Sequence, residues 1–172
     1  MTDFSIRLAK PDDAEALPAI ELAAGTLFKT VEGLADVAGM EAIPAARHRA
    51  MIRKGHCLVA EVQTRLVGFL AAEPCGRELH IREMSVLSDH QGQGIGAVLL
   101  RAIGIDAQNS GFSALTLTTF TDVPWNGPFY SRLGFEHIAD LDSHPRLKAE
   151  IDREVEHGLP RDRRCAMIRF LR

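Results

Sequence analysis

Residues 84–100 read MSVLSDHQGQGIGAVLL, and this stretch joins an apolar strand end to an amphipathic helix through three glycines. The apolar residues after the glycines recur at the spacing of one helix face. Gly92, Gly94 and Gly96 let the backbone approach a ligand closely, and the unpaired N–H groups at a helix start favour phosphate oxygens. The stretch therefore predicts an anion-binding turn between a buried strand and a helix.

Three familiar kinds of glycine-rich turn differ in how well they fit this stretch. A Walker-type phosphate loop requires a lysine followed by Ser or Thr, and no lysine follows Gly94 or Gly96. A dinucleotide fingerprint requires a tight turn directly after its strand, whereas five residues separate Val86 from Gly92. A glycine-rich helix start without a ligand fits the stretch, taken alone, as well as anion binding does.

The strand before the turn has an irregular pattern. Its apolar residues lie first at odd positions, Leu79 and Ile81, and then at even positions, Met84 and Val86. Because strand side chains alternate between faces, a slip near Arg82-Glu83 would turn the core residues outward unless an extra residue forms a β-bulge. The pattern predicts either such a bulge, a feature that favours the neighbourhood of active sites, or an amphipathic edge without one.

The rest of the chain alternates between strand-like and helix-like patterns. Apolar or alternating runs predict strands at 4–8, 57–62, 66–72, 79–86, 114–120, 135–139 and 165–171. Helical spacing predicts helices at 12–24, 44–54, 95–109, 125–133 and 145–157. The stretch from Thr26 to Gly39 is weakly periodic and is predicted to be a loop. With no repeat or long linker, we expect one domain over residues 1–172 of mixed α/β (α+β) class.

Composition excludes several classes of protein. The 172 residues are 46% hydrophobic with a net charge of -3, and the scattered arginines form no basic patch, so no nucleic-acid partner is expected. Three widely spaced cysteines fit neither a disulfide framework nor a metal pair, which favours a reducing cytoplasm. No run reaches membrane-spanning length, and the histidines form no metal-binding cluster, so neither membrane nor metal is expected.

Two sequence blocks resemble the GNAT acetyltransferase superfamily. The family signature is Gln or Arg, two residues, Gly, one residue, then Gly or Ala, here Gln91, Gly94 and Gly96 after the strand end Met84-Ser85-Val86. The second block, FYSRLGF at residues 129–135, is similar to the family's tyrosine helix and Leu-Gly-Phe strand entry. The order of elements also matches over nearly the whole chain, with residues 26–55 matched only loosely.

The resemblance implies a fold and a cofactor. The fold would be a mostly antiparallel sheet of six to seven strands, splayed between strands 4 and 5, with helices on both faces. The co-substrate would be acetyl-CoA. The candidate cofactor-binding residues are Met84, Val86, Gln91, Gly92, Gln93, Gly94, Ile95, Gly96, Asn126 and Phe129. Many family members have Arg or Lys at the positions that Gln91 and Gln93 occupy here. The family also commonly has an asparagine seven residues before the tyrosine. That position is Val123 in this chain, and Asn126 lies four residues before Tyr130.

Amide formation from a thioester requires a neutral amine, a stabilised oxyanion and a proton for the leaving thiolate. By resemblance, Tyr130 donates that proton and the Val86 N–H meets the oxyanion; the alternative for Tyr130 is a core aromatic. Glu83, beside the expected bulge, is the candidate general base through water, or else a solvated strand carboxylate. His80 on the same strand is a second candidate base, or else a structural histidine.

The resulting hypothesis is an N-acetyltransferase that moves an acetyl group from acetyl-CoA to a primary amine of a small molecule or peptide. The amine would attack directly in a ternary complex, and residues 26–54 would form the acceptor wall. The competing hypothesis is a non-catalytic acyl-CoA sensor or interaction domain, because basic residues are replaced in the turn. The sequence also leaves a homodimer open.

Overall fold

The computed structural model describes residues 3–172, and within them a seven-stranded mixed sheet forms the centre of the molecule. The strands are β1 (Ser5–Leu8), β2 (Leu58–Val62), β3 (Arg65–Cys75), β4 (Glu78–Val86), β5 (Ala114–Phe120), β6 (Glu136–His137) and β7 (Arg164–Phe170). Their spatial order is β1-β2-β3-β4-β5-β7-β6. All neighbours are antiparallel except β4 and β5, which are parallel. The predicted mixed, mostly antiparallel sheet is confirmed.

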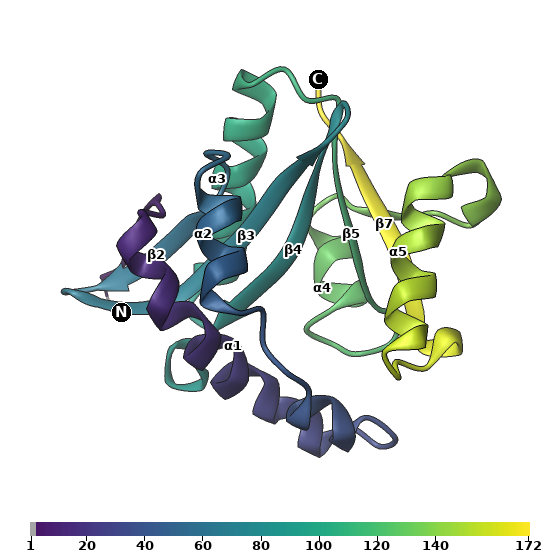
Figure 1. The fold of residues 1–172 in the computed structure, drawn as a ribbon, viewed down its shortest axis with the longest axis horizontal. Coiled ribbons are helices and arrows are strands. Elements are labelled where there is room, and N and C mark those ends of the chain that lie inside the picture. Colours follow the sequence, from purple (N-terminus) through teal and green to yellow (C-terminus); the bar gives the residue numbers. More distant parts are fainter. Residues whose placement is uncertain (1–2) are drawn as a thin grey trace.

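Helices cover both faces of the sheet (Figure 1). They are α1 (Leu17–Gly25), α2 (Ala45–Ile52), α3 (Ile95–Asn109), α4 (Gly127–Arg132) and α5 (Pro145–Glu156). The apolar stripe of α3 packs with Tyr130 of α4 in one core cluster. On the opposite face, α1 and α2 share a second cluster. Another cluster contains Leu147 and Ile151 of α5. No helix within residues 3–172 is long and apolar enough to cross a bilayer.

The sheet opens between its two parallel strands. Only Glu78–His80 of β4 pair with β5, opposite Ala114–Thr116, although both strands continue beyond these residues. The second half of β4 is therefore paired on one side only, with β3, and its other edge faces an opening in the sheet. This is the splay expected between strands 4 and 5.

A bulge in β4 decides which side chains face that opening. Ile81 pairs with Ala72 and Glu83 with Ala71, which leaves Arg82 as an extra residue on β4. Ile81 lies in the core cluster beneath α3, and strict alternation would have placed Glu83 on the same face. The extra residue moves Glu83 to the opposite face, the one that α1 covers. The predicted bulge is confirmed at the position of the phase slip.

Three local expectations were wrong. The segment predicted as a loop, residues 26–39, contains 3₁₀ turns at Thr26–Thr30 and Ala35–Gly39, and Phe28 packs there against Phe120 and Trp125. The strand expected at 135–139 is only two residues long. The helix expected from residue 12 begins as a 3₁₀ turn, Pro11–Ala16, in which Asp13 rather than Asp12 accepts from the Lys10 N–H at 2.6 Å.

Candidate functional site

A cavity of about 740 Å³ lies at the opening of the sheet, and its lining comes from α1, the segment before α2, β4, the glycine turn, β5 and α4. It brings together most of the residues singled out from the sequence. Those on its wall are Glu83, Met84, Val86, Gln91, Gly92, Gly94, Ile95, Gly96, Asn126, Phe129 and Tyr130. Gln93 and His80 are the exceptions, because Gln93 is exposed and neither residue lines the cavity.

The glycine turn leaves room for an anion. Gly92 and Gly94 have φ of 73° and 86°, a conformation that side chains disfavour, and no atom lies within 4 Å of the place where a Cβ would stand at either. The first backbone bond of α3 runs from the Val98 N–H to the Gly94 carbonyl at 3.0 Å, so the three preceding N–H groups have no partner inside the helix. These groups and the helix dipole fit a phosphate ester.

The neighbours of the turn fix its shape. Gln91 donates from Nε2 to the Val86 carbonyl at 2.8 Å, which ties the turn to the end of β4. A Cβ on Gly96 would lie 3.4 Å from both Met84 and Phe129, so a glycine allows β4 and α4 to approach the start of α3 closely. Gln91 therefore acts in the turn through its hydrogen bond rather than through a positive charge.

Glu83 is partly buried and faces the cavity. Its Oε1 accepts from the Ser85 hydroxyl at 3.0 Å. Burial raises the pKa of Glu83 to about 8, and the negative charge of Glu21 on α1 contributes to this increase. A carboxyl group with a pKa close to the working pH can both accept and release a proton there.

Tyr130 forms part of the cavity wall, with its ring held between two phenylalanines. The ring centroids of Phe129 and Phe135 lie 5.5 and 5.7 Å from that of Tyr130, which is 7% exposed. Burial raises the pKa of the phenol above its ordinary value of 10, and the charge of Glu83 raises it further. The hydroxyl therefore stays protonated at neutral pH and can act as a proton donor.

Asn126 precedes α4 and also lines the cavity. Its Nδ2 donates to the Trp125 carbonyl at 3.2 Å, while its Oδ1 is buried with no hydrogen-bond partner within residues 3–172. A buried acceptor without a partner is costly, so this oxygen fits a donor group on a ligand. Val123, at the family's asparagine position, is instead buried in a core cluster.

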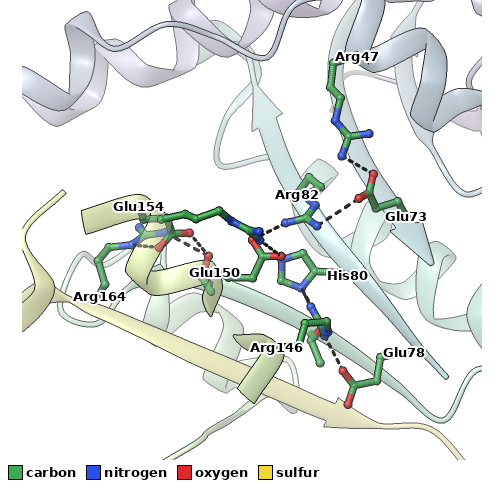
Figure 2. A network of polar contacts seen from close by, with 12 residues as sticks. Arg47, Glu73, Glu78, His80, Arg82, Arg146, Glu150, Glu154 and Arg164 are labelled. Carbon is green, nitrogen blue, oxygen red and sulfur yellow. Dashed lines mark hydrogen bonds and ion pairs between the residues drawn. The ribbon is translucent and has the colours of Figure 1, made fainter. Parts of the chain in front are cut away.

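His80 lies outside the cavity, in a network of arginines and carboxylates (Figure 2). Its ring is 2% exposed, and Nδ1 lies 2.9 Å from the Thr116 hydroxyl and 3.2 Å from an Arg146 nitrogen. Burial lowers its pKa to about 3, and the nearby Arg82 and Arg146 charges lower it further. These surroundings favour a structural role for His80 over a role as base.

Arg82, the extra residue of the bulge, is the centre of that network. Figure 2 shows its guanidinium between Glu73 of β3 and Glu150 of α5, at 3.2 and 2.6 Å. Burial alone would raise the pKa of Glu150, but hydrogen bonds from Arg82 and Arg153 lower it to about 2. The network therefore holds fully charged groups that connect both sides of the opening.

Charged residues on the cavity wall that sequence reasoning missed include Glu21, Glu41, Glu154 and Arg164. Arg164 pairs with Glu154 at 3.0 Å and lies 4.5 Å over the Phe120 ring, so its charge is already matched. Glu21 carried a usable signal, because it is the only charged residue in the helix LPAIELAAG. Among residues 3–172 no group of three or more potential metal ligands is gathered in one place.

Comparisons with known proteins agree with this geometry. Residues 53–137 match the family model described as "Acetyltransferase (GNAT) domain". The fold is similar to that of PaiA N-acetyltransferase from Thermoplasma acidophilum, crystallised with coenzyme A, at TM-score 0.71 and 13% identity over 98% of this chain and 99% of that one. The ribosomal-protein-S18-alanine N-acetyltransferase of Escherichia coli gives TM-score 0.69 and 14% identity, over 98% and 94% of the chains.

A third similar structure is N-acetylglutamate synthase from Neisseria gonorrhoeae, complexed with coenzyme A and N-acetylglutamate. It gives TM-score 0.71 and 21% identity over the whole of this chain, which spans 36% of that protein. The family match shows that residues 53–137 belong to a GNAT acetyltransferase domain, and the splayed sheet and the bulged fourth strand agree with it.

Proposed function

We propose that the protein is an N-acetyltransferase that transfers the acetyl group of acetyl-CoA to a primary amine of a small molecule or peptide. The supporting observation is one cavity that holds the glycine turn, Glu83 and Tyr130 together. None of the three cysteines lines this cavity within residues 3–172, which favours direct attack by the amine over an acyl-cysteine intermediate.

The chain offers separate groups for the two ends of the cofactor. The N–H groups at the start of α3 would hold the diphosphate, and the open edge of β4 at Met84 and Val86 would hold the pantetheine arm. The Leu87 N–H bonds to the Val67 carbonyl on β3 at 2.8 Å, so the Val86 N–H points to the other side, toward the opening. When bound, acetyl-CoA supplies an activated thioester.

Two side chains would carry the proton transfers. Glu83, in its ionised form, takes a proton from the incoming ammonium group and leaves a neutral amine. As the C–N bond forms and the C–S bond breaks, Tyr130 gives its proton to the departing sulfur. The second amine proton then restores the phenol, so the products are an amide and a free thiol, with the first proton released to solvent from Glu83.

The test measures cofactor binding by calorimetry and free thiol release with a panel of primary amines. We expect acetyl-CoA to bind and at least one amine to release thiol, with Tyr130→Phe lowering kcat by about 100-fold while CoA affinity is unchanged. Tight CoA binding without thiol release from any amine would instead support the acyl-CoA sensor. Full activity of Tyr130→Phe at all pH values would show that another group protonates the sulfur.

A further inference from the structure

Glu21 lies on the cavity wall opposite the bulge, although the proposed reaction does not use it. It belongs to α1, which packs across β4 and covers the face to which the bulge turns Glu83. Both carboxyl groups line the same cavity, on the side away from the core cluster that contains Tyr130. An amine entering the cavity between α1 and β4 would therefore meet two carboxyl groups.

The Glu21 carboxyl is fixed by one oxygen only. Oε2 accepts from the Ile43 N–H at 2.9 Å, which ties α1 to the segment that precedes α2. Oε1 is buried and has no hydrogen-bond partner within residues 3–172. A buried carboxylate oxygen without a partner is unfavourable unless a proton or a cation reaches it.

The two carboxyl groups have no counter-ion of their own. Neither makes an ion pair among the described residues, and the nearby Arg164 is committed to Glu154. Burial raises the pKa of Glu21 to about 7, and the charge of Glu21 raises that of Glu83. The titratable groups that face the cavity are Glu21, Glu41, Arg82, Glu83, His90, Tyr130, Arg132, Glu154 and Arg164.

We propose that Glu21 is a second acceptor-binding carboxyl group, which together with Glu83 recognises the acceptor as an ammonium ion. Binding of the cation displaces a proton that the free pair holds, and that proton goes to solvent. The acceptor class is therefore an alkyl primary amine that is charged at neutral pH, rather than a weakly basic aryl amine. This inference rests on the proposed acetyl transfer and names its substrate class.

Glu21→Gln tests the role, because the amide oxygen can still accept from the Ile43 N–H while the charge is lost. The matched control is Glu156→Gln, because Glu156 is an exposed carboxylate at the end of α5. KM for the most rapidly acetylated alkyl amine should rise about 10- to 100-fold in Glu21→Gln, the effect of losing a hydrogen bond to a charged group. The preference for benzylamine over aniline should fall, and CoA affinity should not change.

A second measurement does not depend on turnover. In protein labelled with ¹³C at the glutamate carboxyl carbons, the Glu83 signal should titrate at lower pH in Glu21→Gln than in the wild type or in Glu156→Gln. Propylammonium chloride should shift the Glu21 and Glu83 signals of the wild type. An unchanged KM together with an unmoved Glu83 titration would overturn the proposal.

The two proposals fail differently. If no amine is acetylated, the proposed function fails, and a response of both carboxyl signals to propylammonium still supports a cation site at Glu21. If amines are acetylated but propylammonium moves neither signal, the role of Glu21 is wrong while the acetyltransferase activity stands.

Discussion

Arg82 and Glu83 are neighbours in the bulge of β4, yet their surroundings differ completely. Arg82 joins a network in which Glu73 and Glu150 are matched by arginines, and the pKa of Glu150 is lowered to about 2. Glu83 faces Glu21 without an arginine partner, and burial raises its pKa to about 8. One part of the opening thus holds balanced charges, and the adjoining part holds two carboxyl groups without a counter-ion.

The difference indicates two kinds of role. Balanced buried charges connect β3, β4 and α5 across a place where the sheet lacks backbone hydrogen bonds. The unbalanced carboxyl groups have no counter-ion in the free protein, so their charged forms are desolvated without a compensating charge. Groups of that kind are candidates for binding or catalysis. Substitutions on the two sides should therefore affect different properties.

Glu83→Gln should have the largest effect on activity. Loss of the proposed base should lower kcat by about 10²- to 10⁴-fold, with acetyl-CoA binding retained. Because the pKa of Glu83 is higher in the folded protein than its ordinary value of 4.5, the free energy of unfolding falls as pH rises from 4.5 toward 8. Glu83→Gln should therefore melt at a higher temperature than the wild type at pH 8 and above, and thiol release and thermal melting measure the two effects.

Glu156→Gln serves as the control for this substitution and should change neither property. A Glu83→Gln protein that keeps wild-type kcat would assign the base to water or to another group. A lower melting temperature at pH 8 would mean that the Glu83 carboxylate is compensated in the folded state, as the carboxylates around Arg82 are.

Arg82→Met should have a smaller effect, mainly on stability. It leaves Glu150 with Arg153 and Glu73 with Arg47, at 2.8 and 2.6 Å, so the network is weakened rather than abolished. We expect a loss of about 1–3 kcal/mol in the free energy of unfolding, measured in urea at neutral pH. CoA affinity should stay close to that of the wild type.

The control for Arg82→Met is Arg161→Met, which removes an exposed pair with Asp152. It should cost less than about 1 kcal/mol, as surface ion pairs do. If both variants lose equally little, the network is not what connects the two sides of the opening.

The backbone features that underlie this contrast could be predicted from local sequence. The bulge follows from a slip in a period-two pattern, and the glycine turn follows from residue spacing, so both are local properties that a sequence displays directly. The position of Glu83 beside the cavity follows from the bulge.

The electrostatics could not be predicted in the same way. The environment of His80 depends on Arg146, which is 66 residues away in sequence, and Glu21 meets Glu83 only through the packing of α1 on β4. The 3₁₀ turns between residues 26 and 39 depend on Phe28 packing against Phe120 and Trp125. Long-range contacts of this kind leave no local pattern.

The smallest change that should separate the two regions is a change of pH. Glu150 has a lowered pKa, so its stabilising contribution is complete above the ordinary value of 4.5 and is lost only as pH falls toward 2. Glu83 has a raised pKa, so protonation below about pH 8 removes the base without weakening the fold. The value of kcat/KM, which reports the free enzyme, should therefore fall about tenfold for each pH unit below 8 and recover on return, because the ionised fraction of Glu83 falls about tenfold for each unit. Near-UV circular dichroism should stay native between about pH 5 and 8, whereas an activity limb near 4.5 would show that the pKa of the base is not raised.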